Sequence, residues 1–184
     1  MAASGKGQFS DYTLNRMQDD EEAYLAAGYS PAESKTIPAA QLLLPQLAPM
    51  KELSRYVVDL ANSYRQAGDQ ASADAALQMM AALGQRYANG AAGEATISRL
   101  VGIAVEANAL KAMDPNGPYG SGETVKDRLD VLVQEREQIR QLSSQIEALM
   151  PSMTPEDWIS YKDRWRSFGE DAAGKWLIAK YGQK

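Results

Sequence analysis

Small and large apolar residues alternate on both sides of Gly68, and this alternation limits how the chain can fold. Ala61 and Ala73 are small enough for two helices to approach closely, and Tyr64 and Leu77 can fill the space beside them. Gly68 can adopt the left-handed conformation that ends a helix. The segment therefore predicts two antiparallel helices joined by a tight turn, with Tyr64 and Leu77 buried against each other.

Apolar residues recur with helical periodicity through most of the 184 residues, which predicts an all-α fold. Capping residues, prolines and glycines indicate where the helices begin and end. The predicted helices cover about residues 10–27, 50–67, 70–87, 94–113, 123–150 and 155–168, with short helices starting at Ser30 and near Trp176. Residues 114–122 contain two prolines and three glycines, so we expect a loop there.

The segment before residue 50 contains Pro38, Pro45 and Pro49, which should divide it into short pieces. Within it we expect a buried apolar anchor at residues 42–44. The predicted helix over residues 50–67 carries an apolar stripe that should face the core. The stripe consists of Leu53, Tyr56, Val57, Leu60, Ala61 and Tyr64.

The predicted helix over residues 123–150 has an apolar residue every seven positions, at Val125, Leu132, Ile139 and Ile146. Such a repeat buries one stripe of a helix. Flanking residues widen this stripe beyond what one partner helix covers; they are Leu129, Val133, Leu142 and Leu149. We expect the C-terminal helices to fold back and cover the rest, although a second copy of the chain is the alternative. A monomer is therefore favoured over a homodimer.

A chain of 20.0 kDa can bury one sizeable core but is short for two independent domains. We expect residues 1–9 to form a flexible N-terminal arm and residues 10–184 to form a single all-helical domain. No run of about 20 apolar residues is present, which argues against membrane insertion and predicts a soluble chain. The N-terminal residues do not resemble a secretory signal. The compartment stays open, and it could be extracytoplasmic if an upstream signal or anchor was removed.

The composition excludes several chemistries. The chain has no cysteine and no histidine, so it cannot form disulfides, thiolate sites or Ser-His-Asp triads. The net charge of −5 argues against nucleic-acid binding, which needs a basic surface. The glycine-rich residues 117–124 place Glu123 where a phosphate-binding loop needs lysine. We therefore expect no metal, no nucleotide and no other cofactor.

Seven residues fall at the spacing of the tetratricopeptide (TPR) repeat signature: Leu60, Ala61, Tyr64, Gly68, Asp69, Ala73 and Leu77. The chain thus resembles this family over one repeat, at about residues 57–83. It departs from the family pattern at Met80, where alanine is usual, and at Asn89-Gly90, where the repeat usually closes with proline. The resemblance implies stacked antiparallel helical hairpins, as in an α-solenoid, and a role in docking other proteins.

Aromatic residues gather near the C-terminus and include all three tryptophans. The candidate partner-binding residues are Trp158, Tyr161, Trp165 and Trp176. Aromatic side chains contribute strongly to interfaces, but their helical spacing suits a buried core equally well. The sequence favours a noncatalytic module for protein–protein interaction or scaffolding, not an enzyme. The alternative is a carboxylate- or tyrosine-based enzyme, or a small-ligand binder with a pocket between helices.

Overall fold

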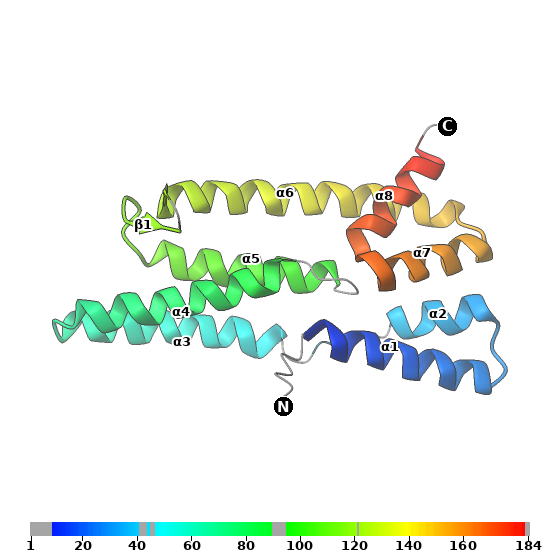
Figure 1. Ribbon diagram of the computed structural model, residues 1–184, viewed down its shortest axis with the longest axis horizontal. Helices are drawn as coiled ribbons and strands as arrows, with labels where there is room; N and C mark the ends of the chain where they lie inside the picture. The colour runs from blue at the N-terminus through cyan, green and yellow to red at the C-terminus, as the bar shows by residue number, and fades with distance from the viewer. Residues whose placement is uncertain (1–8, 41–43, 45–46, 90–94, 121, 183–184) are drawn as a thin grey trace, which may run out of the picture. The chain divides into compact units, whose positions relative to one another are not determined.

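The computed structural model describes residues 9–40, 44, 47–89, 95–120 and 122–182, and it is all-α as the sequence predicts (Figure 1). The side chains of residues 9–14 and 38–40 are not described. The helices are α1 (Phe9–Ala26), α2 (Pro31–Ala40), α3 (Leu47–Gln66), α4 (Gln70–Ala88), α5 (Thr96–Lys111), α6 (Val125–Leu149), α7 (Pro155–Phe168) and α8 (Glu170–Tyr181). A 3-10 turn, Met150–Ser152, joins α6 to α7. No helix within these residues is both long and apolar enough to span a bilayer.

Contacts between Cα atoms divide the chain into two compact units. Unit 1 contains α1, α2, the C-terminal end of α6 from Leu142 onwards, α7 and α8. Unit 2 contains α3, α4, α5 and α6 as far as Gln141. Because two compact units can still unfold together, the single domain expected over residues 10–184 stays a prediction. The expected N-terminal arm lies outside the described residues except for Phe9, where α1 begins.

The hairpin of α3 and α4 in unit 2 has the predicted turn. Gly68 has a φ of +81°, and Asp69 caps α4 by accepting a hydrogen bond of 3.0 Å from the Ser72 backbone nitrogen. Ala61, Ala73 and Leu77 are fully buried between the helices. The core packing around Leu77 is therefore confirmed. Tyr64 packs against this cluster but is only half-buried, because it lies at the edge of the helix pair.

The predicted buried stripe of α3 is wrong at three positions: Leu53 (46% exposed), Tyr56 (64%) and Leu60 (47%). The face that α3 buries is centred near Ser54, whose Oγ accepts a hydrogen bond of 2.9 Å from the amide nitrogen of Asn108 on α5. The apolar pattern of the sequence cannot reveal that a polar residue such as Ser54 is buried. The apolar residues alone therefore predict a buried face that is rotated about the helix axis from the one observed.

Helix α5 approaches α4 so closely that both helices need glycine at the contact. A Cβ added to Gly84 would lie 2.4 Å from the backbone nitrogen of Glu106. One added to Gly102 would lie 2.5 Å from the backbone nitrogen of Ala88. Real Cβ atoms are not found at such distances, so the two glycines set the spacing of this helix pair.

The expected loop over residues 114–122 contains part of a two-residue antiparallel hairpin, in which β1 (Pro118–Tyr119) pairs with β2 (Glu123–Thr124). Helix α2 also differs from expectation, because it continues through Pro38 to Ala40. Proline near the end of a helix removes one backbone hydrogen bond, which costs less there than in the middle. Of the expected apolar anchor, Leu44 is half-buried against the core of unit 2, and Leu42 and Leu43 lie outside the described residues.

The seven-residue repeat of α6 is buried along its whole length, as predicted, at Val125, Leu132, Ile139 and Ile146. The apolar face beside this stripe is narrower than predicted, because Val133 is 57% exposed. Within unit 1, α8 packs on the end of α6: a Cβ on Gly174 would lie 2.2 Å from Cδ1 of Ile146. This contact shows α8 against the last part of α6 only, so the expectation that the C-terminal helices cover the rest of the stripe stays a prediction. The monomeric state stays a prediction.

Candidate functional site

Helix α7 carries the residues of the candidate site and is fixed at both ends. Thr154 and Asp157 form a capping box at its start, and Gly169, with a φ of +88°, ends it. Asp157 is buried and also accepts hydrogen bonds from Lys180 and Tyr181 of α8. These donors hold the pKa of Asp157 well below its usual range. The carboxylate thus joins the start of α7 to the end of α8.

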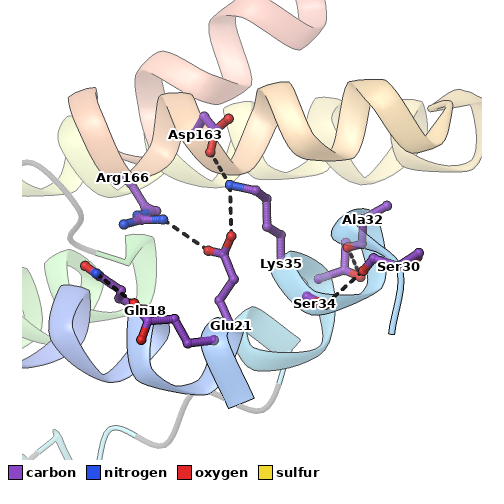
Figure 2. A network of polar contacts seen from close by, with 10 residues as sticks. Gln18, Glu21, Ser30, Ala32, Ser34, Lys35, Asp163 and Arg166 are labelled. Carbon is purple, nitrogen blue, oxygen red and sulfur yellow. Dashed lines mark hydrogen bonds and ion pairs between the residues drawn. The ribbon is translucent and has the colours of Figure 1, made fainter. Parts of the chain in front are cut away.

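A polar network joins α1, α2 and α7 of unit 1 (Figure 2). The Nζ atom of Lys35 on α2 lies 3.2 Å from Oε1 of Glu21 on α1 and 2.5 Å from Oδ1 of Asp163 on α7. Arg166 donates to Oε2 of Glu21 at 3.1 Å. Burial acts to lower the pKa of Lys35, but its hydrogen bonds with Asp163 and Glu21 outweigh this, and the pKa is raised. The network fixes α2 against α7.

A pocket of about 740 Å³ lies in unit 1 and is lined mainly by residues of α2 and α7. Most of its wall is apolar and includes two indole rings, while the polar groups are few. The lining residues are Ser30, Ala32, Glu33, Thr36, Met150, Pro155, Trp158, Lys162, Trp165 and Glu170. Apolar walls with a small number of polar groups are typical of pockets that bind small molecules.

Lys162 is the most unusual residue of this pocket, because it is a charged side chain with only 7% of its surface exposed. Its Nζ atom lies 4.1 Å from the centre of the Trp165 ring and 5.5 Å from that of Tyr161. Within the described part of the chain it forms no hydrogen bond and no ion pair. Burial lowers its pKa to about 8, although the charge of Glu170 partly opposes this effect.

Neither carboxylate of the pocket forms an ion pair with Lys162 in the part of the chain that the structure describes. Glu33 is exposed and accepts hydrogen bonds from the backbone nitrogen and Oγ of Ser30, at 3.0 and 2.6 Å. These bonds, the one from the Ser30 hydroxyl first, lower the pKa of Glu33. Glu170 is half-buried and has interactions of its own. The ammonium group of Lys162 is therefore the most buried charge that the pocket presents to a ligand.

The four aromatic residues that the sequence suggests for partner binding differ in burial and in location. Tyr161 and Trp165 are buried, at 1% and 5% exposure, whereas Trp158 and Trp176 are half-buried. Of these residues, only Trp158 and Trp165 line the pocket. Trp176 lies elsewhere, with the Arg164 guanidinium 5.1 Å from its ring centre. The sequence alternative of a core position is thus correct for Tyr161 and Trp165.

Lys162 is absent from the residues that the sequence suggests, yet the spacing contains a signal for it. It follows Trp158 by four positions and precedes Trp165 by three, which places all three on one face of α7. A lysine among aromatic residues on one helix face must either reach out to water or be buried with them. The sequence does not distinguish these outcomes, and in the structure Lys162 is buried with the aromatic residues.

Unit 2 also contains a buried charge, Glu106, which is fully enclosed. Arg128 donates to both of its carboxylate oxygens, at 2.7 and 3.0 Å, and the Tyr119 hydroxyl donates at 3.1 Å. This carboxylate and tyrosine are of the kind that the enzyme alternative requires. Their polar atoms, however, are occupied with one another, which fits a role in joining α5, α6 and the β-hairpin.

Comparison with protein-family models, with characterised proteins and with solved structures gives no match to this chain. The TPR-like resemblance of residues 57–83 therefore stays a prediction.

Proposed function

We propose that this protein is a noncatalytic binding protein, and that the pocket of unit 1 binds a small organic anion with an apolar body. The observation that carries the proposal is the unpaired, buried ammonium group of Lys162 at an apolar pocket of about 740 Å³. An unpaired buried charge is costly to a folded protein. A bound anion offsets this cost by pairing with it.

The walls of the pocket determine the rest of the ligand. Trp158 and Trp165 offer flat apolar surfaces, and Met150 and Pro155 extend the apolar lining. An aromatic or branched hydrocarbon body buries its surface against such walls at about 25 cal/mol per Å². The ligand class is therefore an aromatic or branched carboxylate that places its carboxylate beside Lys162.

The experiment compares two probes of the same shape by isothermal titration calorimetry with the full chain. 2-Naphthoate has an apolar body and a carboxylate, and 2-naphthylmethanol has the same body without charge. We expect the acid to bind at least about tenfold more tightly, because a charge-assisted contact in a desolvated site is worth about 1.5 kcal/mol or more. Equal affinities of the two probes would contradict the proposal.

The matched variants are Lys162→Met and Lys175→Met, the second at an exposed position of α8 outside the pocket lining. We expect Lys162→Met to remove the advantage of 2-naphthoate and to leave the alcohol unaffected. Lys175→Met makes the same chemical change and should alter neither affinity. An equal loss in both variants would mean that the probe responds to net charge alone.

A protein-binding module is the second candidate function, and the exposed apolar residues of α3 favour it. Leu53, Tyr56 and Leu60 follow one another at i, i+3 and i+7, so they form one stripe along the helix. An amphipathic helix of another protein is the complement of such a stripe. This candidate agrees with what the TPR-like resemblance implies.

The test of this second candidate is retention of a partner by purified variants. A partner protein should bind the unaltered chain and should not bind Tyr56→Glu. It should still bind the control variant Phe168→Glu, which changes an aromatic residue of unit 1 with similar exposure (69%). If the Tyr56→Glu variant still binds every protein that binds the unaltered chain, the exposed stripe of Leu53, Tyr56 and Leu60 is not the docking surface.

A further inference from the structure

Four cationic side chains of unit 2 line one pocket of about 250 Å³, although the chain as a whole is acidic. Lys51 and Arg55 come from α3, Lys111 from α5 and Arg136 from α6. No acidic residue lines the pocket within the described residues. The lining of this pocket is therefore basic in a chain in which carboxylates outnumber cationic side chains.

The four cations of the pocket form no ion pairs with the residues that the structure describes. All four are exposed. Lys51 and Arg55 also stand four positions apart on α3, a spacing at which like charges destabilise a helix. The arrangement therefore costs the free protein some stability and leaves a positive potential over the pocket.

Hydrogen bonds hold Ser54 and Asn108, two polar residues of the pocket lining, in place. Ser54 is 3% exposed, and its Oγ receives the hydrogen bond from the Asn108 amide. The Ser54 hydroxyl in turn donates to the backbone oxygen of Lys51 at 3.2 Å. This chain of hydrogen bonds joins α3 to α5, so the helices that carry Lys51, Arg55 and Lys111 are held together before any ligand arrives.

We propose that this basic pocket is a binding site for a compact polyphosphate group. Two guanidinium groups supply planar pairs of donors that match phosphate oxygens, and two lysines add mobile positive charges. A volume of about 250 Å³ holds linked phosphates but leaves little room for a larger molecule. No aromatic side chain lines the pocket in the described chain, so a nucleobase has nothing on which to stack.

The experiment is isothermal titration calorimetry of the full chain with three anions in a buffer free of phosphate and divalent cations. Tripolyphosphate should bind with one-to-one stoichiometry, and ATP, which carries the same phosphates, should bind no more tightly. Citrate should bind at least about tenfold more weakly, because its carboxylates are spread over a carbon skeleton and match the guanidinium pairs less well. Equal affinity for citrate, or the absence of binding heat for tripolyphosphate, overturns the proposal.

Variants locate the site. Arg55→Gln and Arg136→Gln each remove one lining charge from an exposed position, so the fold should persist, and each should weaken tripolyphosphate binding about tenfold. Arg86→Gln removes an exposed charge of α4 that does not line the pocket, and it should change the affinity less than about twofold. Equal weakening by all three variants shows attraction by net charge only and contradicts a defined site. Lys175→Met, an exposed charge of unit 1 that lines neither pocket, should likewise have no effect.

Discussion

The Nζ atom of Lys162 lies 4.1 Å from the centre of the Trp165 ring, and this contact replaces water around a buried ammonium group. A cation over an indole ring gains about 2 kcal/mol when both are desolvated. Removing an ammonium group from water costs several kcal/mol. The contact therefore offsets only part of the cost, which explains why the pKa of Lys162 falls to about 8.

Lys162→Met should stabilise the free protein at pH 7. Methionine fills a similar volume without a charge, and replacing a buried charge by an apolar group is often stabilising, so we expect the free energy of unfolding to rise by about 1 to 3 kcal/mol. Urea denaturation followed by circular dichroism measures this change. Lys175→Met, at an exposed position, should change stability by less than about 0.5 kcal/mol. A loss of stability in Lys162→Met would mean that the ammonium group is favourably placed.

The same charge predicts how stability depends on pH. The pKa of Lys162 is about 8 in the folded protein and 10.5 in an ordinary lysine, so between these values the unfolded chain binds more protons than the folded one. Stability from this group therefore increases as pH rises from about 8 towards 10.5, by at most about 1.4 kcal/mol per pH unit. The advantage of Lys162→Met over the unaltered protein should shrink across this window. Denaturation at pH 7.5, 8.5 and 9.5 tests this, and a constant difference would contradict the buried, unpaired state of Lys162.

The affinity for an organic anion should show the opposite trend. Above about pH 8 the free pocket loses its positive charge, so 2-naphthoate binding should weaken by up to about tenfold per pH unit. Calorimetry at the same pH values measures this, and 2-naphthylmethanol is the control because its binding needs no charge. An affinity for 2-naphthoate that stays constant up to pH 9.5 would show that Lys162 does not contact the carboxylate.

Patterns among residues that are near in sequence predict much of the fold. The turn at Gly68 and the buried stripe of α6 follow from backbone freedom and from a seven-residue period, and both depend only on residues near in sequence. The face that α3 buries was misplaced, because it depends on a hydrogen bond between Ser54 and Asn108, which are 54 residues apart. A property set by a distant partner leaves little trace in local periodicity.

The candidate sites were less accessible to sequence reasoning for the same reason. The residue types of Trp158 and Trp165 suggest a binding role, but the burial of Lys162 depends on how other segments of unit 1 pack around α7. The basic pocket of unit 2 gathers side chains from three helices, and more than 20 residues separate Arg55, Lys111 and Arg136 from one another in the sequence. Net charge, which is −5, gave no indication of a local positive region.

Gly102→Ala should be one of the most damaging single-methyl changes in unit 2. The added Cβ would lie 2.7 Å from the backbone oxygen of Gly84. The atoms that it meets belong to the backbone of α4, so they cannot move aside without shifting that helix. We expect a loss of about 3 kcal/mol in the free energy of unfolding, the upper range for overpacking. Gly68→Ala is the matched control: its Cβ meets nothing within 4 Å, and the φ of +81° should cost about 1 kcal/mol. Equal losses in the two variants, measured by urea denaturation, would contradict the close contact of α4 and α5.

Glu106→Gln should destabilise unit 2 by leaving Arg128 without its countercharge. The carboxylate of Glu106 is fully buried and the Arg128 side chain is 15% exposed, so the remaining guanidinium cannot reach water freely. We expect a loss of about 3 kcal/mol, since breaking a buried pair costs about 3 to 5 kcal/mol. Adding Arg128→Met to this variant removes the unpaired charge and should restore at least about 1 kcal/mol. The pair of Arg16 (59% exposed) and Asp20 (33% exposed), 3.2 Å apart, is the control because water reaches both side chains: Asp20→Asn should cost less than about 0.5 kcal/mol. If Glu106→Gln costs no more than Asp20→Asn in urea denaturation, the pair does not hold α6 to α5.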